Sequence, residues 1–184
     1  MRIWSILLTV SVLMTGCMPS SPSVQAEVAQ ADVPRETTPD VSEEQMAALV
    51  EGNTAFAADL YQELRDTDGN LFFSPYSIST ALAMTYAGAR GETETQMAET
   101  LHFTLPQDEL HPAFNALDMA LEPGADATDE EFILHIANSL WAEKEYDFRE
   151  AFLDLLARHY GAGLRLVSFK TAPEEAREAI NEWV

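Results

Sequence analysis

The sequence NLFFSPYSISTALAM, residues 70–84, contains the clearest structural signal of the chain. Ser74 is suited to cap a helix N-terminus, and Pro75 to occupy its first position, where the missing N–H removes no hydrogen bond. From there to Ala87 most residues are apolar or small, so we expect a helix that is buried on most sides. Residues 70–73, before the cap, have strand character.

Further elements are expected on both sides of this segment. Ser42 and Gln45 have the spacing of a capping box, followed by a helix with an apolar stripe. More helices are expected over residues 92–101, 111–121 and 149–160 and from Pro173 onward, and strands over 132–141 and 164–169. Helices alternating with non-consecutive strands are typical of an α+β domain. Because the strands lack partners and the last helix is unfinished, we expect a fragment of a larger domain.

The first residues have the pattern of an export signal. Arg2 precedes an apolar run, residues 3–14, that is too short to span a bilayer permanently. The run leads into Met14-Thr15-Gly16-Cys17, which resembles the lipobox of bacterial lipoproteins, where the cysteine is acylated and becomes the mature N-terminus. Because Cys17 is the only cysteine, we expect it to be the site of lipid attachment. The alternative is a plain secretory peptide with an incidental cysteine.

The sequence predicts three regions: a lipoprotein signal peptide over residues 1–17, a flexible tether over 18–41 and a folded domain over 42–184. The tether is expected because residues 18–41 are rich in Pro, Ser, Ala, Thr and acids without periodic hydrophobic residues. Met18, rather than Asp, follows the cysteine, which by resemblance to lipoprotein sorting favours the outer membrane. An extracellular location is the alternative. Without a second cysteine, the domain must be stabilised by its core.

The charge balance excludes several classes of partner. The chain has 31 Asp and Glu against ten Lys and Arg, a formal net charge of -21. Phosphate backbones and anionic headgroups are repelled by such a chain, so nucleic acid is not an expected partner. Contact with a membrane is expected only through the lipid anchor.

From about Asn53 to Val184 the sequence resembles the serpin family. Besides residues 70–84, the similar segments are YAGARGET at 86–93, IANSLW at 136–141, YGA at 160–162 with VSF at 167–169, and INEWV at 180–184. They follow the family's order at compatible spacing. The resemblance implies an α+β serpin fold that contains helices A to F and the first strands of sheets A and B, incomplete at its C-terminal side.

The resemblance also implies a function. Serpins inhibit serine proteases, and in some members cysteine proteases, by offering a bait loop. After cleavage this loop inserts as a new strand in sheet A and traps the acylated protease. The reactive bond would lie beyond Val184, so neither the target protease nor inhibitory competence can be read from this sequence. The alternatives are a non-inhibitory binding or structural module with the serpin fold, or a truncated fragment without activity.

By the same resemblance, five positions match the shutter region, where sheet A opens, or its buried polar partners: Ser74, Pro75, Ser77, Asn138 and Asn181. Small hydroxyls and amides can exchange hydrogen bonds between two packings, which an apolar contact cannot do. The alternative is that Ser74 is only a helix cap and Asn138 a satisfied buried amide. None of the five is expected to be catalytic.

Other functional classes are not favoured by the sequence. It contains no Gly-x-Ser-x-Gly, no His-Glu-x-x-His and no glycine-rich phosphate loop, so an enzyme is not expected. Residues 107–122 match the helix that binds glycosaminoglycans in some serpins but contain no Lys or Arg, so heparin is not expected as a partner. No metal or other cofactor is expected, because the four histidines lack ligand spacing: His102, His111, His135 and His159.

Overall fold

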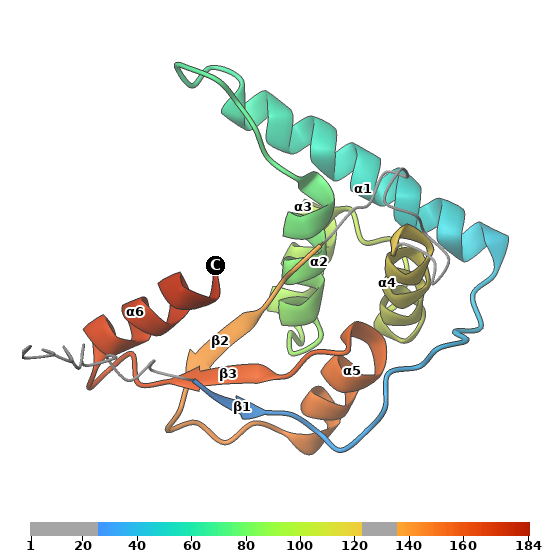
Figure 1. The fold of residues 1–184 in the computed structure, drawn as a ribbon. Helices are drawn as coiled ribbons and strands as arrows, with labels where there is room; N and C mark the ends of the chain where they lie inside the picture. Colours follow the sequence, from blue (N-terminus) through green and yellow to red (C-terminus); the bar gives the residue numbers. More distant parts are fainter. Residues whose placement is uncertain (1–25, 123–135) are drawn as a thin grey trace, which may run out of the picture.

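The computed structural model describes residues 26–122 and 136–184, which form an α+β fold (Figure 1). In these ranges the elements, in chain order, are β1 (Glu27–Ala29), α1 (Glu43–Leu64), α2 (Pro75–Tyr86), α3 (Glu92–Leu101), α4 (Gln107–Leu121), β2 (Leu140–Glu143), α5 (Glu150–Tyr160), β3 (Leu164–Val167) and α6 (Pro173–Trp183). No helix in this part of the chain is long and apolar enough to cross a membrane.

The three strands form one sheet in the order β1-β3-β2. β2 runs parallel to β3, with Leu140 opposite Leu164, and β1 pairs antiparallel with the other edge of β3. Because side chains alternate along a strand, β3 directs Leu164 and Leu166 to one face and Arg165 and Val167 to the other. The first face packs against residues of α2 and α5, and the second against α6. Helices therefore cover both faces.

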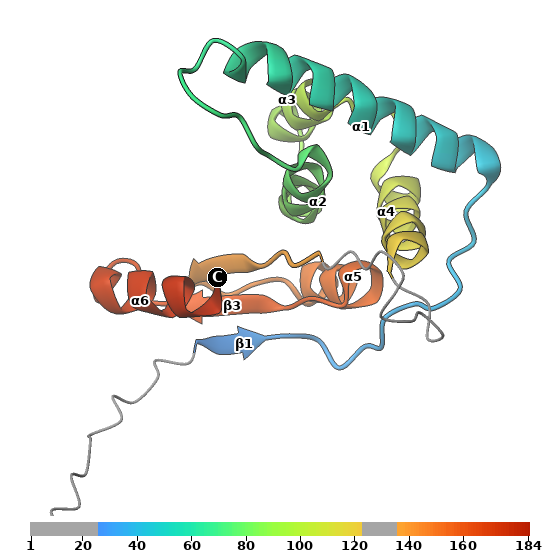
Figure 2. The same cartoon turned by 45° about the horizontal axis from the view of Figure 1, so that its top comes forward.

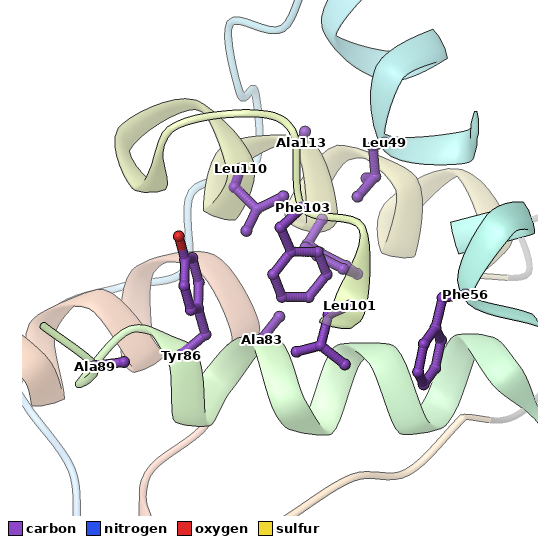
Figure 3. Close-up of a cluster of buried hydrophobic side chains, with 10 residues drawn as sticks. Leu49, Phe56, Ala83, Tyr86, Ala89, Leu101, Phe103, Leu110 and Ala113 are labelled. Carbon is purple, nitrogen blue, oxygen red and sulfur yellow. The ribbon is translucent and has the colours of Figure 1, made fainter. Parts of the chain in front are cut away.

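A second core joins the N-terminal four helices (Figure 3). Phe103 lies at its centre, with ring centroids 5.3 Å from Tyr86 and 5.7 Å from Phe114. α1 crosses the end of α3 at Gly52, where a Cβ atom would overlap the carbonyl of His102. The glycine therefore allows direct contact between α1 and the backbone that follows α3.

Helix starts that depend on local chemistry match the predictions. Ser42 caps α1 through a capping box: the Ser42 N–H donates to Gln45 Oε1 over 2.8 Å, and the Gln45 N–H donates to Ser42 Oγ. α2 begins at Pro75 with Ser74 as its cap, and α3 spans residues 92–101 as expected. α4 begins at Gln107, four residues before the predicted start.

The strand predictions needed correction. Residues 70–73 are not a strand, and Phe72 is 97% exposed. The strand predicted over 132–141 is wrong in its position: β2 occupies Leu140–Glu143, residues 136–139 are irregular, and residues 132–135 lie outside the described ranges. β3 ends at Val167 rather than at 169. A strand exists only where a neighbour pairs with it, and β2 matches the four positions opposite Leu164–Val167.

The prediction of a flexible tether over residues 18–41 is wrong for residues 26–41, which we call the strap. The strap forms β1 and then passes α5 and α4 before it joins α1 (Figure 2). Ala26, Ala29 and Val41 each pack against a different hydrophobic core cluster. A three-residue strand followed by an irregular segment has too little periodicity to be recognised as folded, so the sequence pattern resembles a linker.

Candidate functional site

The first turn of α2 contains three of the residues singled out in the sequence. Ser74 Oγ accepts a hydrogen bond from the Ser77 N–H over 3.2 Å and also donates to Ser77 Oγ over 3.0 Å. Pro75 occupies the first helical position. Ser74 is exposed, and the cap accounts for its contacts in this part of the chain. The structure therefore brings Ser74 and Ser77 together at the entrance of the helix.

One turn further along, α2 buries two hydroxyls. Ser79 is 0% and Thr80 is 6% exposed, and neither hydroxyl has a hydrogen-bond partner among the described residues. Thr80 lines a cavity of about 180 Å³, whose wall also includes Asn138 and Tyr160. A buried hydroxyl without a partner costs about 1–3 kcal/mol, so the Thr80 side of α2 favours any packing that supplies a partner. The unpartnered Thr80 hydroxyl and the Asn138 side chain thus lie between α2 and the segment that enters β2.

The two asparagines that the sequence grouped with α2 lie apart. Asn138 is half-buried in the wall of the cavity beside Thr80, two residues before β2. Asn181 is exposed on α6, which packs on the Val167 face of the sheet, opposite the face that contacts α2. In the described part of the chain, the structure therefore places Asn138 near α2 but does not bring Asn181 to it.

A polar cluster joins the strap to α4. The Arg35 guanidinium donates to Asn115 Oδ1 over 2.8 Å, to Asp118 Oδ2 over 2.7 Å and to Glu122 Oε1 over 3.0 Å. The Tyr76 hydroxyl of α2 lies 3.4 Å from the other Asp118 oxygen. Burial, and then the Asp118 carboxylate, raise the pKa of Tyr76, so its hydroxyl keeps its proton.

A buried histidine lies next to this cluster. His111 is 1% exposed, and its Nδ1 lies 2.7 Å from the Tyr160 hydroxyl oxygen. Burial, and then the positive charges of His159 and Arg90, lower the pKa of His111 to about 3. His111 is therefore neutral at physiological pH. Across residues 26–122 and 136–184, no three His, Cys, Asp or Glu side chains are grouped to hold a metal ion.

The other histidines are dispersed. His102 Nε2 lies 2.7 Å from Asp59 Oδ2, which links the end of α3 to α1. His159 lies 3.7 Å from a Glu36 oxygen, and burial lowers its pKa. His135 falls outside the described residues.

The Arg35 cluster was not predicted from the sequence. One signal was available: Arg35 is the only Lys or Arg between residues 3 and 64, and residues 107–122 carry four acidic side chains but no Lys or Arg. An isolated base and a one-sided acidic helix are a plausible pair, although nothing in their spacing indicates that they meet. The buried Thr80 and His111 likewise have no local sequence signature.

Comparison with known proteins shows the family to which this chain belongs. The sequence model of the family described as Serpin (serine protease inhibitor) matches residues 51–184. The leukocyte elastase inhibitor of Equus caballus is 44% identical over 142 residues, 76% of this chain and 36% of that protein. The human protein of the same name is 40% identical over 141 residues, again 76% of this chain and 36% of the relative.

The similarity extends to a further serpin-like protein and to a solved structure. An uncharacterized serpin-like protein of Thermococcus kodakarensis is 38% identical over 144 residues, 78% of this chain and 33% of that protein. The structure of ovalbumin from emu (Dromaius novaehollandiae) matches with a TM-score of 0.64 and 30% identity, over 74% of this chain and 38% of that one. The chain spans about a third of the length of these relatives. Its fold is the serpin fold, and the chain belongs to the serpin family.

Proposed function

We propose that this chain is the N-terminal part of an inhibitor of serine proteases that acts by reactive-loop insertion. The proposal is supported by the polar groups at the boundary between α2 and the sheet. There the buried Thr80 hydroxyl has no partner in the described part, and Thr80 shares a cavity with Asn138. A sheet that must accept a new strand needs neighbours that can change hydrogen bonds at low cost, and this boundary supplies them.

The roles of five residues are part of this proposal. Ser74, Pro75 and Ser77 fix the start of α2, so that the helix keeps its position while the strands above it separate. Asn138, at the entrance of β2, would exchange partners with the α2 hydroxyls when the sheet opens. Asn181 would join the polar group only in the complete molecule. None of these side chains would touch the reacting bond of the protease.

The names of the relatives indicate which protease to test first. The horse and human relatives are named leukocyte elastase inhibitors. We therefore propose a serine protease of the elastase type as the first candidate, with other serine proteases and cysteine proteases as further members of the panel.

The proposal predicts a covalent complex. The complete protein that contains this chain is incubated with leukocyte elastase and a panel of other proteases, then boiled in denaturant and run on a gel. Loop insertion traps an acylated protease, so a band of the summed mass should survive boiling. The control is the same protease with its catalytic serine blocked beforehand, which should give no such band. Cleavage of the protein without a complex would instead identify a non-inhibitory member of the family.

We further propose that the protein is exported and lipid-anchored to a bacterial envelope through Cys17. The support is the sequence alone: the short apolar run and the single cysteine at its end. Such an anchor would hold the inhibitor at a membrane surface, with the outer membrane favoured by Met18. The acidic chain itself would not adhere to anionic lipid, because its net charge is -21.

A further inference from the structure

The strap is bound at both ends by specific contacts. At the sheet, Glu27–Ala29 pairs antiparallel with β3, with Val28 opposite Arg165, and Glu27 forms an ion pair with Lys144 at 2.7 Å. The strap backbone at Ala29 lies very close to Gly163. A Cβ atom on Gly163 would lie 2.8 Å from the Ala29 carbonyl oxygen, which is shorter than real Cβ contacts allow. The strap backbone therefore rests directly on a residue that has no side chain.

The second end is held by a buried amide. Asn115 is 0% exposed; its Oδ1 accepts from Arg35, and its Nδ2 donates to the Glu36 carbonyl oxygen over 2.7 Å. The Glu36 N–H donates to the Arg158 carbonyl oxygen at the end of α5 over 2.9 Å. Arg35 adds its ion pairs to α4. Arg35 and Glu36 therefore provide hydrogen-bond partners for the buried Asn115 side chain of α4 and for the Arg158 carbonyl of α5.

The strap covers the outer edge of β3, which would be prone to pair with other strands if it were exposed. β3 has β2 on one side and β1 on the other. Without β1, the backbone donors and acceptors at the outer edge of β3 have no partner, beside Leu164, which is 3% exposed when the strap is in place. An open edge with apolar side chains is a template for pairing with another strand. Three paired residues alone bind weakly, so retention of β1 depends on the Arg35 contacts.

We propose that the strap is a removable edge cover that keeps the protein monomeric. When the strap leaves, the β3 edge of one molecule pairs antiparallel with the β3 edge of a second copy. A second copy is the partner that this geometry favours, because two identical edges that pair antiparallel are related by a twofold axis and close into a dimer. The proposal does not depend on protease inhibition, and its test uses no protease.

Two substitutions at opposite ends of the strap test this proposal in the complete protein, expressed from residue 18 onward. Gly163→Ala places a methyl group against the Ala29 carbonyl, and Arg35→Gln removes the ion pairs to α4. Gly88→Ala is the matched control, because a Cβ there meets only ordinary contacts, the nearest at 3.5 Å. Amide hydrogen exchange over residues 27–36 and molar mass by size-exclusion chromatography with light scattering are measured for each.

The proposal expects both variants to exchange these amides at least about tenfold faster than the parent protein and to form a dimer, while Gly88→Ala stays protected and monomeric. A peptide of residues 26–40 should return Arg35→Gln to monomer, since the peptide supplies the native strap. It should not rescue Gly163→Ala, whose methyl group blocks the peptide too. The proposal would be overturned if the two variants exchanged faster without forming a dimer, or if their exchange were unchanged. It would also be overturned if the peptide did not return Arg35→Gln to the monomer.

Discussion

His111 is a titratable side chain that the core holds in its neutral form. It belongs to α4, and the rings of Tyr86 of α2 and Tyr160 of α5 lie beside it, while the charges of His159 and Arg90 act on it. Its Nε2 has no partner in the described part of the chain. Protonation would bury an imidazolium among aromatic rings, which is why the pKa falls to about 3.

This environment predicts that acid destabilises the fold through His111. The folded pKa is below the unfolded value near 6.5, so the unfolded state binds the proton first, and stability is lost as pH falls from about 6.5 toward 3. At pH 4.5 the loss relative to pH 8 should be about 2–3 kcal/mol. His111→Gln keeps an amide for the Tyr160 hydroxyl but cannot titrate. Denaturant unfolding of both proteins at several pH values should give a flatter profile for the variant, and parallel profiles would contradict the assignment.

At the scale of elements, the contact between α1 and the end of α3 opposes local propensity. Within a helix, Gly→Ala normally stabilises by up to about 1 kcal/mol. At Gly52, however, the added methyl group would overlap the His102 carbonyl, whose residue has a left-handed φ of 56° and little freedom to move. Gly52→Ala should therefore destabilise the complete protein by about 1–3 kcal/mol.

The measurement for Gly52→Ala is the unfolding midpoint in denaturant, with exposed Thr54→Ala on the same helix as the control. A midpoint that rises for Gly52→Ala would show that propensity outweighs the contact.

The same contrast between local and distant effects explains which elements could be predicted. The starts of α1 and α2 are encoded within four residues, by Ser42 with Gln45 and by Ser74 with Pro75, and both predictions are confirmed. The strands depend on partners far along the chain: β1 pairs with residues more than 130 positions away. Its existence therefore cannot be read from Glu27–Ala29 alone.

The candidate site follows the same rule. Ser74 was predicted as a cap because a cap is a local motif, Ser77 was added by resemblance, and the two side chains do lie together. The Arg35 contact with α4 joins residues 80 or more positions apart, and spacing does not reveal such a pair. Asn181 illustrates the opposite case, because resemblance grouped it with α2 while the described chain leaves it exposed on α6.

At the scale of the whole molecule, the docked strap limits how far the domain can lie from a lipid anchor. The residues that the structure describes begin at Ala26, and eight residues, 18–25, separate Ala26 from Cys17. Even a fully extended chain of that length spans only about 26–29 Å. With a tether ending at residue 41 the reach would be about three times greater. If Cys17 carries lipid, the β1 end of the sheet is therefore held near the membrane, and the proposed protease partner would have to approach from elsewhere on the molecule.

The anchor itself is tested by labelling and fractionation. Cells that express the complete protein should incorporate labelled palmitate into it, and Cys17→Ala should abolish the label and move the protein from the membrane pellet to the supernatant. Ser21→Ala is the control and should behave as the parent. High salt should not release the parent protein, because a chain of net charge -21 has no electrostatic attraction to anionic lipid for salt to screen. Equal labelling of the parent and Cys17→Ala would contradict the anchor, and the limit on the height of the domain would then no longer apply.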